Sequence, residues 1–462
     1  MTAIEGFAYT RTLSDFAHSI ETAKVPADVA HEVGRIVLDA IGSAVAGRVI
    51  PAGQIAVDLV RDEHGPLETV VYGANRASVM PAVFANTVLT NALDFDIYGP
   101  EGHVAPVVVP VALGIADAIG APGSEAFAGV VAGMEVGGRV GGALRRPGMG
   151  GARSLGAVRG HGHVVFGAVA AAGRVLRLTP DEMHHAFGIA GYSANVPTLR
   201  KFFASPHAPM TKYDHLGLMA QNGLQAALLA KRGFTGDLDV LEGDIGFWRF
   251  AGGQGCDWEH LVKNLGTDWT IREVSYKPFP VSLYTNPGIV TARRVAAENG
   301  LRPDEIEHVQ IRTTRAGDTP EKTQLRHSLD AWDNANYTMA AGLFDVRPLR
   351  SWQEPQTYQR KDLIDFMKKV EITRMREGEL TSTGNYWERW SPVRVTIKAR
   401  GQTFEGADDF LPMIDDEGLK AKFHENVAGF IPESRARQLE DACWNLPGLQ
   451  RARELVDLLM GG

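Results

Sequence analysis

The chain has 462 residues, of which 44% are hydrophobic and 22% are charged, and its formal net charge is −8 at pH 7. This length and composition are typical of a globular protein with two domains, and the negative charge argues against a nucleic-acid-binding protein, which needs a basic face. No apolar run is long enough to span a bilayer, and the N-terminus lacks the basic and apolar regions of a secretory signal. We therefore expect a cytoplasmic protein without a membrane segment, whose two cysteines, Cys256 and Cys443, are buried thiols.

Periodic apolar residues predict helix after helix from residue 1 to about residue 265. The segment PADVAHEVGRIVLDAIG, which begins at Pro26, places Val, Ile and Ala on one face. Thr179, Pro180 and Glu182 stand at the positions of a capping box, which predicts the start of another helix. Small residues recur in GVVAGMEVGGRVGGAL, and we expect them to let helix backbones approach closely.

The pattern changes near residue 268, where apolar and polar residues begin to alternate. Half-buried strands are predicted around residues 309–313, 370–372 and 393–397, with a turn at Gly401. The helical pattern returns after about residue 406. The sequence thus predicts a mainly α protein, in which a large all-helical domain of residues 1–267 and 407–462 is interrupted by a smaller α+β domain of residues 268–406.

Four short segments concentrate polar and ionisable side chains beside the ends of predicted helices. They are NALDFDIYGPEGHVAP with Asp94, Asp96, Tyr98 and His103, RGHGHVVFGAVAAAG with Arg159, His161 and His163, PMTKYDHLG with Lys212, and SYKPFPVSLYTNPG with Lys277 and Asn286. Helix N-termini can bind anions, and histidine can act as an acid or a base near neutral pH. Each residue alone also has an ordinary structural interpretation, such as a helix cap or a solvated lysine. The occurrence of all four segments in one chain, rather than any one of them, indicates a functional site.

Motifs for the common cofactors do not occur in the sequence. It has no dinucleotide fingerprint, phosphate-binding loop, HExxH helix or GxSxG elbow. His161 and His163 could share a metal ion, but no Cys, Asp or Glu cluster with ligand spacing accompanies them. We therefore expect a protein that needs no metal and no cofactor.

Several segments, in this order along nearly the whole chain, resemble the MmgE/PrpD family. They are VLDAIGSAVAG, ALDFD followed by a histidine, HVVFGAVAAAGRVL, MTKYDHLGLMAQNGLQAALLAKRGFTG, LEGDIGF and KPFPVSLYTNPGI. The family contains dehydratases, decarboxylases and epimerases of small polycarboxylic acids. The resemblance implies a helical domain with a smaller α+β lid, a homodimer, and an active site between the helical domain and the lid.

The resemblance also implies roles for individual residues. Asp94 matches the first aspartate of the family's Asp-Phe-Asp segment, and His103 matches the histidine that acts on the substrate proton. His161 matches the histidine before the Phe-Gly-Ala helix, and Lys212 matches an anion-binding lysine.

Two positions depart from the family pattern. Tyr98 stands where the family usually has threonine, and its hydroxyl could be a second proton donor. Asn286 stands where the family often has a histidine before proline, and an amide cannot shuttle a proton. This loss of one acid/base group keeps an epimerase or isomerase open as an alternative.

We expect a cofactor-free lyase of the dehydratase or decarboxylase type, which acts on a small polycarboxylic acid through proton transfer next to a carboxylate. His103 would exchange the proton, while Lys212 and Lys277 would hold carboxylates and stabilise negative charge. The predicted catalytic residues are Asp94, Tyr98, His103, His161 and Lys212, and the predicted substrate-binding residues are Asp96, Arg159, Lys277 and Asn286. The alternatives are an epimerase of a related acid and a non-catalytic family member that only binds its ligand.

Overall fold

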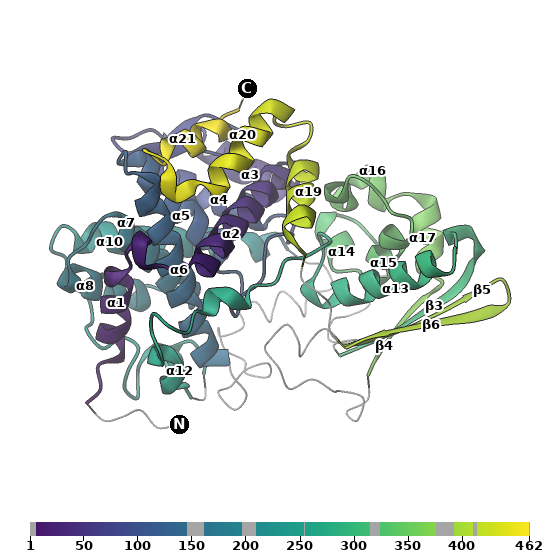
Figure 1. Ribbon diagram of the computed structural model, residues 1–462, viewed down its shortest axis with the longest axis horizontal. Coiled ribbons are helices and arrows are strands. Elements are labelled where there is room, and N and C mark those ends of the chain that lie inside the picture. Colours follow the sequence, from purple (N-terminus) through teal and green to yellow (C-terminus); the bar gives the residue numbers. More distant parts are fainter. Residues whose placement is uncertain are drawn as a thin grey trace.

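The protein is mainly α-helical, with a smaller α+β portion, as the sequence predicts (Figure 1). The computed structural model describes residues 6–145, 161–195, 209–253, 255–314, 324–375, 392–409 and 414–461. We call the helices before residue 263, together with those after residue 415, the helical part, and we call residues 286–409 the lid. In Figure 1 the helical part fills the left of the view and the lid lies on the right.

The helical part contains most of the helices. They are α1 (Tyr9–Ser19), α2 (Ala27–Ala46), α3 (Pro51–Val60), α4 (Val79–Asn91), α5 (Ala105–Ala118), α6 (Gly123–Arg145), α7 (Val164–Val175), α8 (Pro180–Tyr192), α10 (Thr211–Ala230), α11 (Phe247–Phe250), α12 (Trp258–Val262), α19 (Asp416–Val427), α20 (Glu433–Trp444) and α21 (Arg453–Val456). A short antiparallel hairpin of β1 (Glu68–Val70) and β2 (Arg76–Ser78) lies between α3 and α4. The predicted capping box is present at the start of α8, where Thr179 and Glu182 bond each other's backbone N–H groups.

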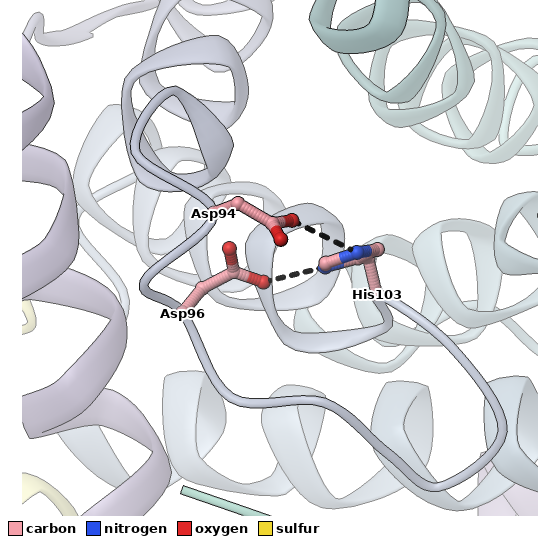
Figure 2. A group of neighbouring side chains, drawn as sticks. All are labelled: Asp94, Asp96 and His103. Carbon is pink, nitrogen blue, oxygen red and sulfur yellow. Dashed lines mark hydrogen bonds and ion pairs between the residues drawn. The ribbon is translucent and has the colours of Figure 1, made fainter. Parts of the chain in front are cut away.

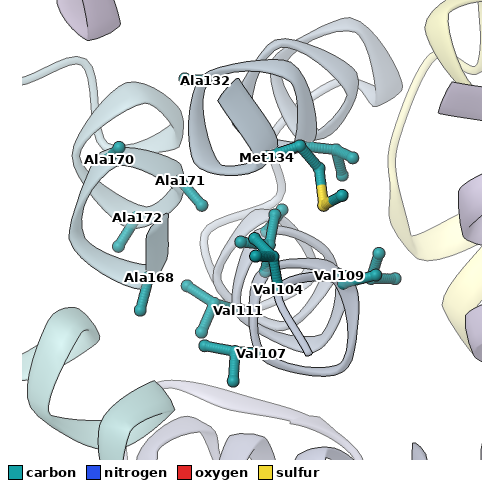
Figure 3. Close-up of a cluster of buried hydrophobic side chains, with 14 of the residues drawn as sticks. Val104, Val107, Val109, Val111, Ala132, Met134, Ala168, Ala170, Ala171 and Ala172 are labelled. Atoms are coloured by element: carbon teal, nitrogen blue, oxygen red, sulfur yellow. The ribbon is translucent and has the colours of Figure 1, made fainter. Parts of the chain in front are cut away.

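The core of the helical part is built from small and β-branched residues. Figure 3 shows the valines of α5 beside the alanines of α7 and Met134 of α6. A Cβ atom added at Gly133 of α6 would lie 2.8 Å from the carbonyl oxygen of Gly167 in α7. The small residues therefore do allow the close backbone approach that the sequence predicts. Both cysteines are free and buried, again as predicted.

The lid consists of short helices and one four-stranded sheet. The helices are α13 (Asn286–Glu298), α14 (Ser328–Trp332), α15 (Ala335–Leu343), α16 (Pro355–Tyr358) and α17 (Lys361–Met367), and the strands are β3 (Ile306–Thr313), β4 (Val370–Arg374), β5 (Val393–Ala399) and β6 (Gln402–Asp408). The strand order is β4-β3-β5-β6, with β3 parallel to β4 and the other pairs antiparallel. The predicted turn at Gly401 joins β5 to β6 in the left-handed conformation, with φ of 69°.

The last helices of the chain return to the first ones. Both α19 and α20 pack against α2, and α19 also contacts the lid, so that it lies where the two parts meet (Figure 1). One apolar core contains α2 and α19 together, through residues such as Val37 and Phe423. A second core holds the lid sheet, and it also includes Leu93, Phe95 and Tyr213 from the helical part. The segment after α4 is therefore packed against the lid core.

The described part of the chain has no single helix that is long and apolar enough to cross a membrane. The bent pair Ala27–Val49 and Pro51–Val60, at 94° to each other, reaches that length and apolarity only when its two helices are taken together.

Candidate active site

The segment between α4 and α5 is an interior loop rather than a surface turn. From Ala92 to Val104 every residue except Glu101 is buried. Gly99 and Gly102 have φ of 118° and 138°, values that L-residues rarely adopt, and they turn the chain back toward α5. Because buried polar groups need internal partners, the loop's ionisable side chains must bond one another or neighbouring elements.

His103 has one carboxylate against each of its ring nitrogens (Figure 2). Its Nδ1 lies 2.8 Å from Oδ2 of Asp96, and its Nε2 lies 3.3 Å from Oδ1 of Asp94. The Asn91 amide donates to the other oxygen of Asp96 at 2.8 Å and lies 3.1 Å from Nδ1. Since the Asp96 carboxylate can only accept, the network assigns a proton to Nδ1. Nε2 is then the nitrogen that can exchange a proton.

Asp94 is the centre of the network. Nζ of Lys212 lies 2.8 Å from its Oδ1, and Nζ of Lys277 lies 2.9 Å from its Oδ2 and 2.6 Å from its backbone oxygen. Nε1 of Trp332, in the lid, donates to Oδ2 at 2.9 Å. Burial by itself would raise the pKa of the Asp94 carboxyl, but the ammonium groups of Lys212 and Lys277 outweigh burial and hold that pKa well below its usual range. Asp94 is therefore ionised at neutral pH.

Lys212 stands in the first turn of α10 with only 6% of its surface exposed. Its Nζ lies 4.6 Å from the ring centroids of both Tyr213 and Trp332, within the range of a cation–π contact. Burial lowers the pKa of the Lys212 ammonium, and the attraction of Asp94 offsets this effect only in part. Asp94 accepts one of its three N–H donors, so the ammonium can also hold an anion.

His161 and Tyr98 complete a cluster of rings around His103. The ring centroids of His103 and His161 are 5.3 Å apart, and the Tyr98 ring lies 5.2 Å from His103 and 6.2 Å from His161. Tyr98 pairs with Ser275 through two backbone hydrogen bonds of 2.9 and 2.7 Å, which bring the segment of Lys277 to the loop.

The backbone of two site residues is strained. Asp94 and His161 have φ of 52° and 61°. This left-handed conformation costs a non-glycine residue roughly 1–3 kcal/mol, and such strain clusters at functional sites. The surrounding contacts must therefore hold both residues in place.

Both halves of the chain match models of one protein family. Residues 11–258 match the MmgE/PrpD N-terminal domain, and residues 279–446 match the MmgE/PrpD C-terminal domain. The chain belongs to the MmgE/PrpD family. Similar proteins named cis-aconitate decarboxylase come from Aspergillus terreus, with 26% identity over 97% of this chain and 95% of that protein, and from Homo sapiens, with 25% identity over 98% and 94%. A protein of that name from Mus musculus is 24% identical over 98% of this chain and 93% of its own length.

The five predicted catalytic residues of this MmgE/PrpD chain come together in this network. They are Asp94, Tyr98, His103, His161 and Lys212, and Asp96 and Lys277 join them. Asn286 is buried elsewhere and uses both polar groups locally: Oδ1 accepts from the Phe279 N–H at 3.0 Å, and Nδ2 donates to the Ser282 carbonyl at 3.1 Å. A role for Asn286 in substrate binding stays a prediction. Arg159 lies outside the described residues.

Three further residues of this MmgE/PrpD chain border the network and were not among the predicted site residues. Asn91 fixes Asp96, and Trp332 reaches Asp94 across 238 positions of sequence. His215 lies one turn after Lys212 on α10, and its buried Nε2 has no hydrogen-bond partner among the residues that the structure describes. Burial lowers the pKa of His215 to about 4, so the ring is neutral at physiological pH. For Asn91 the sequence offers a local indication of its place, because it ends the helix that precedes the loop.

Asp94, Asp96 and His103 also resemble a metal-binding group. Each offers one ligand atom, and within the described ranges these atoms lie within 4.8 Å of one another. However, Asp94 is already bonded to two ammonium groups, and both would repel a divalent cation placed beside it. The donor set therefore does not suit a metal ion while Lys212 and Lys277 are charged.

A cavity of about 510 Å³ lies along α8 and α10 and is lined by residues such as Tyr192, Asn222 and Phe234. None of the network residues lines it. The chemistry-bearing side chains are instead nearly enclosed, with 7% of His103 and 6% of His161 exposed. Such burial strengthens each electrostatic interaction in the site.

Proposed function

We propose that the protein is a cofactor-free lyase that removes carbon dioxide from a small polycarboxylic acid, with cis-aconitate or a close analogue as substrate. The observation that carries the proposal is the buried network in which His103 lies between Asp94 and Asp96, beside the cation of Lys212. Three relatives that align with nearly the whole chain bear the name of a decarboxylase of this substrate class, which supports this chemistry over others of the family.

Binding of the substrate depends on cations in an enclosed site. Lys212 has N–H donors to offer beyond the one that Asp94 accepts. A charged hydrogen bond to a substrate carboxylate is worth about 1.5–3 kcal/mol. In this proposal the imidazole of His161, whose ring lies beside that of His103, bonds a second carboxylate of the same molecule.

The chemical step needs one proton and one stabilised charge. The bond between the departing carboxylate and the carbon skeleton breaks, and its electron pair stays on the skeleton, delocalised toward a neighbouring carboxylate. Lys212 stabilises this negative charge. His103 donates the proton on Nε2 to the carbon, carbon dioxide leaves, and solvent returns a proton to the imidazole. Asp96 holds Nδ1–H throughout, so the ring keeps its orientation.

The test is product analysis in D₂O. We would incubate the protein with cis-aconitate and with a panel of related di- and tricarboxylic acids, and follow the products by NMR and carbon dioxide release. We expect carbon dioxide and an unsaturated dicarboxylic acid that carries one solvent deuterium. A dehydratase would release water and form an alkene without carbon dioxide, and an epimerase would exchange deuterium and change only the configuration. Either result would overturn the decarboxylase proposal, as would binding of the panel without turnover.

A further inference from the structure

A second buried ion pair lies behind the site loop. Lys422 of α19 and Asp39 of α2 are joined by a contact of 2.6 Å between Nζ and Oδ1, and their side chains expose 5% and 0% of their surface. The two residues are separated by 383 positions of sequence. Asp39 falls within VLDAIGSAVAG, one of the segments that carry the family resemblance, whereas Lys422 lies in none of them.

The pair bonds the loop backbone on both sides of Asp96. Nζ of Lys422 donates to the carbonyl oxygen of Phe95 at 2.7 Å, and the N–H of Ile97 donates to Oδ2 of Asp39 at 2.9 Å. The same ammonium lies 3.9 Å from the centroid of the Phe95 ring. Since Asp96 is the acceptor of His103 Nδ1–H, these two bonds fix the backbone that carries that acceptor.

Stability alone is a weak reason for such a pair. Burial raises the pKa of the Asp39 carboxyl and lowers the pKa of the Lys422 ammonium, in spite of their mutual attraction. Replacing a buried ion pair by apolar side chains of similar volume is often neutral or stabilising. What an apolar pair would not supply is a donor for the Phe95 carbonyl and an acceptor for the Ile97 N–H.

We propose that Asp39 and Lys422 are positioning residues, which act through the backbone of Phe95 and Ile97 to set Asp96 against His103. In the proposed reaction, Asp96 orients the ring whose Nε2 gives the proton. The effect on turnover thus rests on the proposed function, whereas the effect on the His103 ring does not.

The experiment compares Lys422→Met with a matched control. Arg174→Met removes a partly buried cation, which donates to the Ile20 carbonyl and to Glu125, both at 2.6 Å, at the opposite end of α7 from His161. Lys422→Arg keeps a donor and a positive charge. The double variant Asp39→Asn with Lys422→Met leaves no buried carboxylate without a cation. If the single variant Lys422→Met does not fold, the double variant is measured in its place.

Two readouts are needed. The first is kcat and KM against pH, normalised to folded protein. The second, without substrate, is the NMR signal of the His103 imidazole in protein with ¹³C-labelled histidine, assigned by its loss in His103→Asn. For Lys422→Met we expect kcat to fall by about 10- to 100-fold, because a misplacement of about 1 Å can cost roughly 100-fold. We also expect little change in KM, a displaced pH profile and a shifted His103 signal, with recovery of most of kcat in Lys422→Arg.

Arg174→Met should lose thermal stability but keep kcat, the pH profile and the His103 signal. If Lys422→Met, or the double variant, behaves like this control, the positioning role is wrong and the pair is only structural. If the wild-type protein turns over no acid of the panel, the proposed function fails, and the His103 signal alone still decides whether Lys422 positions the ring.

Discussion

The imidazole of His103 has carboxylates on both sides, and each carboxylate accepts from a further neutral donor: Asp96 from the Asn91 amide and Asp94 from the Trp332 indole. We predict that His103→Asn lowers kcat by about 10²- to 10⁴-fold, the usual contribution of general acid–base catalysis, while KM changes little. The measurement is deuterium incorporation from D₂O into the product. His18→Asn, which replaces a histidine bonded to the Leu178 carbonyl, is the control. Undiminished incorporation by folded His103→Asn would move the role to Tyr98 or His161.

Lys212 is expected to contribute both to substrate binding and to the stability of the fold. We predict that Lys212→Met loses roughly one to two powers of ten in kcat/KM, the value of a charged hydrogen bond to a carboxylate. The sequence alone favours little effect on folding, but the buried contact with Asp94 leads us to expect destabilisation. Breaking a buried pair costs up to about 3–5 kcal/mol, and Lys277 remains on Asp94 to reduce this cost. Lys231→Met, at the C-cap of α10, is the control.

The stability difference between the wild-type protein and Lys212→Met should depend on pH. In the folded protein the pKa of Asp94 lies below its unfolded value of about 3.9, so the ionised carboxylate contributes stability that is fully present above about pH 4 and is lost as pH falls through the folded value. Removing one ammonium makes this depression of the pKa smaller. Urea unfolding should therefore show a difference that is largest near neutral pH and that shrinks in acid. A difference that does not change with pH would contradict the assigned role of Asp94.

Among the elements of the lid, α14 bonds directly to the loop between α4 and α5. Its last residue, Trp332, donates to Asp94 and covers the Lys212 ammonium. We predict that Trp332→Phe, which keeps an aromatic ring but removes the N–H, lowers kcat/KM by about 10- to 100-fold, as for loss of a hydrogen bond to a charged group. Trp352→Phe deletes the same donor within the lid, where it bonds the Val346 carbonyl. Equal activity of the two variants would exclude a role for the Trp332 N–H.

Elements could be predicted from the sequence where local rules decide them. The capping box of α8 and the alternating strands β3 and β5 follow from neighbouring residues, and both are present. The contacts of the site follow from packing instead. Nothing near Trp332 indicates that it bonds a residue 238 positions away, and nothing near Asp96 shows that it, rather than Asp94, holds Nδ1 of His103. The family resemblance indicated several side chains that the fold brings together, but the bonding partner of each is defined only by the fold.

At the scale of the whole molecule, the ammonium groups of Lys212 and Lys277 already neutralise the charge of the carboxylates around His103. A divalent ion beside Asp94 would therefore be repelled by both ammonium groups. We predict that chelator treatment leaves kcat/KM unchanged and that added Mg²⁺, Mn²⁺ or Zn²⁺ does not raise it. The assay is the product analysis described above, with the protein dialysed against EDTA. Loss of activity that a divalent ion restores would make Asp94, Asp96 and His103 its ligands.

The return of α19 to α2 also has a consequence for the order of events during protein synthesis. Asp39 leaves the ribosome long before Lys422, which follows it by 383 positions. Before Lys422 is made, Asp39 lacks the cation with which it pairs in the folded protein. Because burial raises the pKa of its carboxyl, Asp39 must then be either protonated or in contact with water. A nascent chain that has already folded α2, α4 and the lid thus still lacks the donor for the Phe95 carbonyl. The loop that carries His103 is therefore completed only after Lys422 has been made, although Phe95 precedes Lys422 by 327 positions.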